Sequence, residues 1–510
     1  MLVKTFGCAI IGINAIIVTI EVNSEKGIQF FLVGLPDNAV KESHQRILAS
    51  FSNLGYKFPR KRLTINMAPA DIRKEGAAYD LALAIAVMAV SDQVDATKLD
   101  QYIVMGELSL DGVLNPIRGV LPMAIKAKEE GFKGIIIPQE NAQEAAVVEG
   151  LEVIGAENLK QVVDFLNGEL VIEPERMDLN GLESDGSYPW DFQDVRGQES
   201  IKRALEIAAS GFHNVLLIGS PGSGKTMLAK RLPSILPPMT LAEALETTKI
   251  HSVAGLMGHH QTLLTTRPFR SPHHSISDAG LCGGGSIPQP GEISLANNGV
   301  LFLDEVPEIQ RHTLEILRQP MEDREITISR AKMSVRFPAN FMLVAAMNPC
   351  PCGYYNHPDR ECVCKPGEVQ KYLNKISGPL MDRIDLHVEV LPVPYEELSD
   401  TRKGEPSAEI RKRVIKARMI QEERFKEFPG IHANAQMTTK LLQKYCALDQ
   451  KSQDALRNAM RRLGLSARAY DRILKVARTI ADLDGSERIQ HDHLSEAINY
   501  RSLDRDNWGS

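Results

Sequence analysis

The sequence predicts an α/β protein whose central part is built on a parallel sheet and whose C-terminal part is helical. Two apolar runs, Asn214–Ile218 and Val300–Leu303, are each followed by polar residues of the kind that cluster at the carboxyl ends of parallel strands. Strand-like and helical segments also alternate over residues 1 to 168, which predicts a second α/β domain. Beyond Glu396 the periodicity is helical through Tyr500.

Length and composition limit the possible classes of protein. A chain of 510 residues is too long for one hydrophobic core, so about two to four domains are expected. Apolar residues make up 43% of the chain and charged residues 24%, which is ordinary for a soluble globular protein. The net charge of −6 excludes a generally basic protein. If nucleic acid is a partner, the positive surface must be local.

The early apolar stretch from Cys8 to Ile20 is too short and too interrupted to span a bilayer, because Gly12 and Asn14 break it and Glu21 ends it. We interpret it as strands and expect a cytoplasmic protein without a membrane anchor. The chain has seven cysteines, four of them clustered, and this clustering argues against the disulfide framework of a secreted protein.

The N-terminal elements can be assigned in order from their patterns. Strands are predicted over residues 16–20, 29–33, 62–66 and 134–138, and helices over residues 80–90 and 123–130. From Glu173 to Trp190 the composition changes to Asp, Glu, Gly, Ser and Pro, which is typical of a linker. The predicted organisation is therefore a domain over residues 1–170, a linker over 171–190, an α/β core over 191–395 and a helical lid over 396–510. The polar tail from Arg501 is expected to fray.

A phosphate-binding loop follows the first of the two central strands. Its glycines let successive backbone N–H groups turn toward the phosphates of a nucleotide. Lys225 can then reach the β- and γ-phosphate oxygens, and the Thr226 hydroxyl can ligate Mg²⁺. The loop consists of Gly219, Ser220, Pro221, Gly222, Ser223, Gly224, Lys225 and Thr226.

The second central strand ends in two acids, Asp304 and Glu305. One carboxylate can hold the metal's ligand shell and the other can activate water. A phosphate loop combined with an acidic strand at this separation predicts a nucleotide hydrolase.

Four segments carry a resemblance to a known family. The stretch Asp191–Glu199 resembles the entry segment of AAA+ ATPases. Pro290–Glu305, Ala345–Pro349 and Gly378–Leu386 resemble the magnesium-chelatase branch of that superfamily, and over nearly the whole chain the resemblance is to the ComM (YifB-like) competence proteins. The resemblance implies an ATP-dependent hexameric DNA helicase that uses Mg²⁺ and promotes branch migration in homologous recombination during natural transformation. Recombination proteins are then possible partners.

The same resemblance implies roles for individual residues. Asp304 would position Mg²⁺, Glu305 would orient or deprotonate the attacking water, and Asn348 would sense the γ-phosphate. Arg383 matches the arginine finger, which enters the neighbouring subunit's site and stabilises the charge of the transition state. Arg468 resembles the second sensor of the lid, with Arg472 as its alternative. Structural alternatives stay open: Asn348 can cap the turn before Pro349, and Arg383 can pair with Asp382 or Asp385.

Two loops are candidates for contact with DNA. Arg324–Phe337 is predicted to form a hairpin with Arg330 and Lys332 at its tip, which suits a phosphate backbone if the tips line a pore. The alternative is a solvated turn. Arg267–His274 leads into glycines 283–285 and is predicted to be mobile. Its adjacent histidines can bind a metal, although hydrogen bonding is the commoner role.

The four clustered cysteines are predicted to bind zinc. In an extended segment, residues i and i+2 face the same side, so each C-x-C pair can present two thiolates. A turn between the pairs would complete the tetrahedral S₄ site that Zn²⁺ prefers. The alternatives are two disulfides or replacement of one thiolate by His357. The predicted ligands are Cys350, Cys352, Cys362 and Cys364.

The N-terminal domain resembles the proteolytic domain of Lon, through the stretches Pro69–Leu81, Gly106–Ile117 and Ile137–Asn141. The position of the nucleophilic serine holds Ala78, and Gly119–Met123 contains no amine where the activating lysine is expected. A Ser–Lys dyad cannot work without both members, so we predict a scaffold and no peptidase activity.

Three functional classes compete. A hexameric ATPase moving on single-stranded or branched DNA leads, ahead of a chelatase motor subunit and a protein-remodelling ATPase. The added N-terminal domain and the cysteine cluster favour the first.

Overall fold

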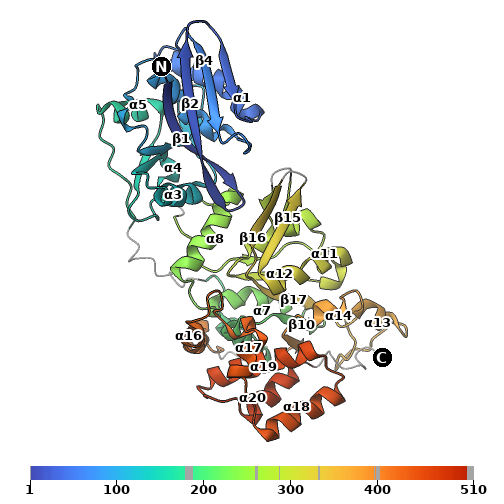
Figure 1. Ribbon diagram of the computed structural model, residues 1–510. Coiled ribbons are helices and arrows are strands. Elements are labelled where there is room, and N and C mark those ends of the chain that lie inside the picture. The colour runs from blue at the N-terminus through green and yellow to red at the C-terminus, as the bar shows by residue number, and fades with distance from the viewer. Residues whose placement is uncertain are drawn as a thin grey trace. The chain divides into compact units, whose positions relative to one another are not determined.

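The computed structural model describes residues 2–177, 188–258, 262–285, 288–330, 333–394, 397 and 403–501. The chain forms two compact units (Figure 1). The N-terminal unit contains Met1–Glu183 together with Leu241–Thr265, and the C-terminal unit contains Ser184–Thr240 together with Thr266–Ser510. The domain boundaries predicted from the sequence stay a prediction. In the sequence, the segment Leu241–Thr265 lies between the phosphate loop and the acidic strand, yet it belongs to the N-terminal unit.

The N-terminal unit is built on a seven-stranded mixed sheet in the order β3-β4-β2-β1-β5-β8-β9. The long strands β1 and β2 form an antiparallel hairpin, drawn in dark blue in Figure 1, and β4 pairs with β2 antiparallel. The other neighbours pair in parallel. The strands are β1 (Leu2–Ile11), β2 (Asn14–Glu25), β3 (Phe30–Val33), β4 (Arg62–Ala68), β5 (Tyr102–Val104), β8 (Gly134–Pro138) and β9 (Glu152–Ala156), with a separate two-stranded pair of β6 (Glu107–Leu108) and β7 (Leu114–Asn115).

The helices of this unit follow the apolar patterns of the sequence. Every residue of α2 (Asp80–Ala89) is buried, as its nearly continuous apolar run requires, and the Asp80 carboxylate pairs with Arg46 at 2.6 Å. The predicted helix at residues 123–130 begins three residues earlier because Gly119 forms its N-cap. The remaining helices are α1 (Asn38–Leu54), η1 (Ala77–Tyr79), η2 (Ala96–Lys98), α3 (Val120–Glu129), α4 (Gln139–Ala145) and α5 (Leu159–Asn167).

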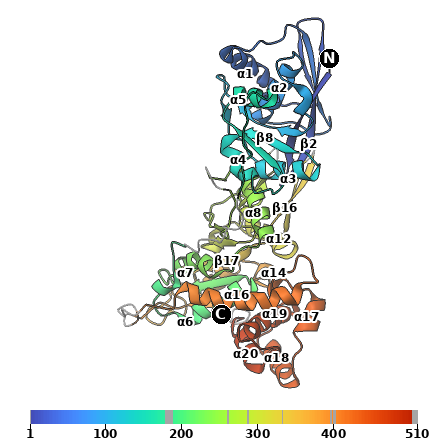
Figure 2. The same cartoon turned by 90° about the vertical axis from the view of Figure 1, so that its left-hand side faces the viewer.

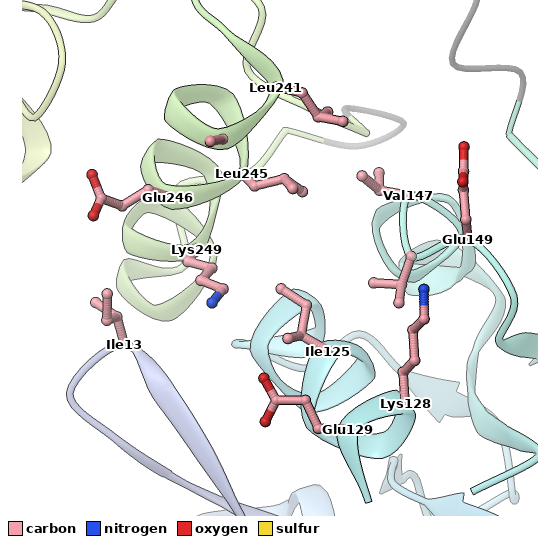
Figure 3. A pocket seen from close by; sticks show the side chains of 12 residues that line it. Ile13, Ile125, Lys128, Glu129, Val147, Glu149, Leu241, Leu245, Glu246 and Lys249 are labelled. Atoms are coloured by element: carbon pink, nitrogen blue, oxygen red, sulfur yellow. The ribbon is translucent and has the colours of Figure 1, made fainter. Parts of the chain in front are cut away.

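Helix α8 (Leu241–Ala254) completes the N-terminal unit. The Ser252 hydroxyl donates to the buried Glu144 carboxylate at 2.5 Å, and the Ser252 carbonyl accepts from the N–H of Gly119 at 3.2 Å. A cavity of about 690 Å³ lies between α8, α3 and the β1–β2 turn, and Figure 3 shows Leu245 and Ile125 among its lining side chains. All the residues that line the cavity belong to the N-terminal unit, and none of them is a residue of the phosphate loop.

The C-terminal unit contains a five-stranded sheet in the order β11-β14-β17-β10-β18, and all its strands are parallel. Strand β10, which precedes the phosphate loop, lies between β17 and β18, and β14 lies on the other side of β17. The carboxyl ends of these strands therefore meet at one edge of the sheet. The strands are β10 (Val215–Gly219), β11 (Phe269–Arg270), β14 (Val300–Leu303), β17 (Met342–Met347) and β18 (Leu386–Val390).

Short helices and two hairpins accompany this sheet. The hairpins pair β12 (Gly283–Gly284) with β13 (Gln289–Pro290), and β15 (Glu325–Arg330) with β16 (Met333–Pro338). The helices are η4 (Phe192–Asp194), α6 (Glu199–Gly211), α7 (Lys225–Arg231), η5 (Leu232–Ile235), α9 (Asp278–Cys282), α10 (Glu292–Leu295), η6 (Val306–Glu308), α11 (Arg311–Ile316), α12 (Arg318–Asp323), α13 (Glu368–Leu373) and α14 (Gly378–Met381).

The C-terminal part of this unit is helical, as predicted, and contains no strand over residues 403–501. Helices α16 and α19 run side by side in Figure 2. The fully buried Asp482 carboxylate holds this region together through Arg424 at 2.5 Å and Arg478 at 3.1 Å. The helices are α16 (Ser407–Phe425), η7 (Asn434–Gln436), α17 (Thr439–Tyr445), α18 (Gln450–Arg462), α19 (Ala467–Leu483) and α20 (His491–Asn499).

The fold class predicted from the sequence is confirmed: two α/β parts, a parallel sheet beneath the phosphate loop and a helical C-terminal region. None of the helices in the described ranges combines the length and the apolar character that crossing a bilayer requires.

Candidate active site

The phosphate loop links β10 to α7, as the order of strand, loop and helix predicts. Gly222 and Gly224 adopt left-handed φ angles of 79° and 95°, which side chains disfavour. At Gly219 a Cβ would lie 2.2 Å from the Val390 carbonyl oxygen, so only glycine lets the loop leave β10 beside β18. The Gln198 amide supports the loop from outside by donating to the Ser223 carbonyl at 2.9 Å.

Lys225 is buried at the start of α7. Its ammonium donates to the carbonyls of Gly219 at 2.7 Å and Ser220 at 3.0 Å, which are groups of the loop itself. Burial lowers the pKa of Lys225, and the carboxylates of Asp304 and Glu305 partly offset this shift. Lys225 is the one cationic residue of the loop sequence Gly219–Thr226, so it is the residue of the loop that can balance phosphate charge.

The two acids after β14 differ in their environments. The Asp304 carboxylate accepts from the Thr226 hydroxyl at 2.6 Å, so the two predicted Mg²⁺ ligands already touch. Glu305 adopts a left-handed φ of 49° and leaves 54% of its side chain exposed. Its carboxylate is therefore accessible to water, while that of Asp304 faces the loop.

Asn348 follows β17, the strand between β10 and β14. Its side-chain oxygen accepts from the Lys225 ammonium at 3.1 Å. The structure thus brings Asn348 together with Lys225, Thr226, Asp304 and the rest of the phosphate loop. A carbonyl-type oxygen and two carboxylates beside a lysine suit a magnesium–nucleotide complex, because Mg²⁺ prefers oxygen ligands and the lysine balances phosphate charge.

His274 is a residue that the sequence did not link to the acids. The imidazole Nδ1 of His274 lies 3.4 Å from the Glu305 carboxylate. The ring of His273 packs against the ring of His274, with 4.0 Å between the two ring centroids. The parallel pairing of β11 with β14 carries this loop to the acidic residues. Within the described ranges, neither histidine belongs to a group of three or more potential metal ligands.

Arg383 lies in the turn after α14 and is 5% exposed. Its guanidinium pairs with the Glu322 carboxylate of α12 at 2.6 Å and donates to the Pro379 carbonyl at 2.5 Å. The structural alternative that named Asp382 or Asp385 as its partner is wrong. Asp382 contacts Ser466, and Asp385 is engaged elsewhere.

The two candidates for the second sensor differ in what they contact. Arg472 pairs with the buried Asp385 at 3.1 Å. Burial alone would raise the pKa of Asp385, but Arg472 and His213 hold it well below its usual range. Arg468 is exposed on α19 and makes no ion pair within the described ranges. Of the two arginines, Arg472 is engaged by a carboxylate and Arg468 faces solvent.

The hairpin formed by β15 and β16 has the predicted alternation, with Ile326, Ile328, Val335 and Phe337 buried and the intervening residues mostly exposed. Arg330 ends β15, is exposed, and donates to the Gly285 carbonyl at 3.2 Å. Lys332, the other predicted cation of the tip, lies outside the described residues. Arg324 anchors the base of the hairpin through the Gly430 carbonyl at 2.9 Å.

The four clustered cysteines form one compact group. Their sulfur atoms all lie within 4.8 Å of one another, and three of the distances are 3.3, 3.6 and 3.7 Å. These distances exceed a disulfide bond, and all four cysteines are free. A tetrahedral ZnS₄ site has sulfur atoms about 3.8 Å apart, so the group fits zinc. His357 is not a member of the group, since its Nδ1 accepts from the Asp359 N–H.

The Lon-like positions of the N-terminal unit remain without catalytic groups. Ala78 occupies a short helical turn, and Lys74, an amine close to it in sequence, is buried and donates to the carbonyls of Ile72 and Pro69. A lysine held in this way is not positioned to activate a nucleophile.

Comparison with known families accounts for most of the chain. The family model described as "Magnesium chelatase, subunit ChlI" matches residues 191–398. The models described as "Subunit ChlI of Mg-chelatase" and "Magnesium chelatase, subunit ChlI C-terminal" match residues 20–141 and 404–501.

Individual relatives agree with the family models. The chain is 46% identical to "Competence protein ComM" of Haemophilus influenzae over 98% of its own length and 97% of that protein's. It is 45% identical to "Uncharacterized protein YifB" of Salmonella typhimurium, covering 98% and 96% of the two lengths. The "Magnesium-chelatase 38 kDa subunit" of Rhodobacter capsulatus is 24% identical over 59% of this chain and 84% of its own. The chain belongs to the ComM/YifB family of magnesium chelatase-like AAA+ proteins.

Proposed function

We propose that this protein is an ATP-driven ring motor that moves on single-stranded or branched DNA and promotes branch migration. The observation that supports ATP hydrolysis is the convergence of the phosphate loop, Asp304, Glu305 and Asn348 at one edge of a parallel sheet. The near full-length likeness to "Competence protein ComM" supports a role with incoming DNA during natural transformation. A cytoplasmic location suits both roles.

The residues of the loop divide the work of phosphoryl transfer. The backbone of Gly219–Thr226 and the Lys225 ammonium would bind the phosphates, and Thr226 with Asp304 would hold Mg²⁺. When bound, Mg²⁺ supplies positive charge to the phosphate oxygens. Glu305 takes a proton from the attacking water, as its exposed carboxylate allows. The Asn348 side chain, whose oxygen accepts from the Lys225 ammonium, donates through its amide nitrogen to the γ-phosphate or accepts from the water.

Arg383 serves the neighbouring subunit in this proposal. Its guanidinium is held by Glu322, and in a hexamer it exchanges this carboxylate for the phosphate of the adjacent site. Such a cation contributes about 10³–10⁵-fold to rate in other nucleotidases. Arg468 on α19 adds charge from the lid as the second sensor.

The β15–β16 hairpin is the proposed gripping element. Arg330 is exposed at the end of β15, and Lys332 follows it in the sequence. A small group of cations binds phosphates without reading bases, which a translocating ring requires.

The cysteine cluster is proposed to hold a structural zinc ion. The four thiols are free and their sulfur atoms lie close enough together to bind a single ion. Zinc sites with four protein ligands are structural, which supports this role.

The sharpest first test is the rate of ATP hydrolysis by the purified full-length protein with and without forked DNA. A DNA motor is expected to hydrolyse faster on forked DNA than alone. A porphyrin-chelatase motor subunit is the second candidate, favoured by the three family models. If the protein is a chelatase motor subunit, its rate of ATP hydrolysis should not change with DNA and should increase when the partner chelatase subunits are added.

A further inference from the structure

The segment that carries the four cysteines contacts the phosphate loop of the proposed nucleotide site. Cys350 is fully buried and follows Asn348 by two residues. Asn348 in turn contacts the Lys225 ammonium at 3.1 Å. Any shift of the Cys350 sulfur is therefore transmitted through Pro349, whose ring limits backbone rotation, to a residue that touches the phosphate loop.

A second contact joins the turn between the cysteine pairs to the loop. The Gly353 N–H donates to the Cys350 carbonyl at 3.0 Å, and Gly353 adopts a left-handed φ of 85°. A Cβ at this position would lie 2.5 Å from Cδ and 2.7 Å from Cγ of Pro221. The backbone of the turn thus packs against the proline of the phosphate loop with no room for a side chain.

The chain leaving the cluster returns to the same asparagine. Helix α13 begins four residues after Cys364, and its Tyr372 is 7% exposed. Burial raises the pKa of Tyr372 to about 12, and the nearby backbone of Asn348 partly offsets that shift. Both ends of the cysteine segment therefore converge on Asn348. Between Cys350 and Gly367 the chain has no helix or strand, so few hydrogen bonds of its own fix its shape.

We propose that zinc bound by Cys350, Cys352, Cys362 and Cys364 fixes Asn348 and the phosphate loop, so that zinc and ATP bind cooperatively. The metal site acts as a switch for the nucleotide site, and a chain without zinc holds ATP weakly. This inference rests on the proposed zinc site. The physical reason is that four metal–sulfur bonds replace the missing secondary structure of the segment that lies on Pro221.

The test measures binding of a fluorescent ATP analogue with Mg²⁺ to the full-length protein before and after treatment with a zinc-selective chelator. Removing zinc should raise the dissociation constant of the analogue by about tenfold, within the range usual for coupled sites, and adding zinc back should restore it. Because coupling is reciprocal, the analogue should also lower the fraction of zinc lost to a fixed chelator concentration. Unchanged affinity after verified zinc removal would overturn the inference and leave the zinc site standing.

A matched pair of variants tests the contact while zinc stays bound. Gly353→Ala adds a methyl group against Pro221, whereas Gly367→Ala has the same kind of left-handed φ, 82°, with no atom within 4 Å of the new Cβ. Both should retain zinc, and only Gly353→Ala should weaken binding of the analogue. Equal effects of the two variants would contradict the contact. Freshly prepared reduced protein without zinc would instead reject the proposed zinc site itself.

Discussion

Among single residues, Lys225 and Thr226 of the proposed nucleotide site are each paired with groups of the same site. Lys225 contacts loop carbonyls and Asn348, and Thr226 contacts Asp304. Each contact joins groups that a magnesium–nucleotide complex would engage, so binding exchanges partners instead of creating buried unpaired charges. Glu305 differs, because 54% of its side chain is exposed and its carboxylate lies 3.4 Å from the imidazole of His274.

This difference separates the effects of two substitutions. Lys225→Ala should weaken nucleotide binding, because the cation within the loop is lost. Glu305→Gln should leave binding intact and lower turnover on the order of 100-fold or more, because it removes only the catalytic base. Binding of a fluorescent nucleotide and steady-state phosphate release measure the two effects.

Glu308→Gln is the control for Glu305→Gln. It makes the same chemical change at a nearby acid whose carboxylate pairs with Lys375 at 3.3 Å, and its turnover should stay near normal. Near-normal turnover of Glu305→Gln would remove that residue from its assigned role.

At the scale of elements, the sequence predicted those parts of the site that depend on local pattern. Apolar runs followed by polar residues identified β10 and β14, and the family resemblance singled out Asn348 after β17. Parallel pairing of these strands then places Lys225, Asp304 and Asn348 together. The C-x-C spacing similarly predicted four thiols around one point, which the cluster of sulfur atoms bears out.

Contacts between distant segments could not be predicted in this way. Glu322 lies on α12 and Arg383 lies in the turn that follows α14, and no local pattern links them. Helix α8 is an ordinary helix in sequence, yet its Ser252 pairs with the buried Glu144 of the N-terminal unit. Such pairings depend on the packing of whole elements, which a single sequence does not reveal.

The hairpin is expected to grip DNA through charge alone. Arg330→Ala combined with Lys332→Ala should weaken DNA affinity with little sequence bias and make its salt dependence shallower, because fewer counterions are released. Basal ATP hydrolysis should survive, while DNA stimulation falls. Fluorescence anisotropy at several salt concentrations measures the slope.

Arg336→Ala supplies the hairpin's control. Arg336 is an exposed cation on β16 that lies 3.7 Å from Glu325, away from the tip, so its loss should leave the slope almost unchanged. If the double variant unwinds DNA as fast as the parental protein, an element other than this hairpin holds the DNA.

The cysteine cluster should bind about one zinc ion per chain. Cys350→Ser combined with Cys364→Ser should abolish that zinc and lower Tm by about 5 °C or more, because site formation is linked to folding. Elemental analysis and thermal unfolding give the two readouts. Cys282→Ser, at a free cysteine outside the cluster, should keep its zinc. Zinc-free parental protein would reject the site.

In the whole molecule, the proposed ring depends on subunits that complete one another's active sites. Arg383→Ala and Lys225→Ala chains should each hydrolyse ATP poorly, yet mixtures should recover part of the activity. In mixed rings an intact Arg383 can face an intact phosphate loop. Hydrolysis across a series of mixing ratios measures the recovery, and sedimentation verifies that mixed rings form. Mixed rings without recovery would assign Arg383 to its own subunit or to the fold.

In the proposed function, ATP hydrolysis at this site moves branched DNA, and conversion of a synthetic four-way junction reports that movement. The measurement is the rate at which the full-length protein converts the labelled junction to duplex products with ATP and Mg²⁺, beside Glu305→Gln. We expect conversion by the parental protein with ATP, none without nucleotide, and none by Glu305→Gln although it binds ATP. A parental protein that hydrolyses ATP at full rate and leaves the junction intact would contradict the claim.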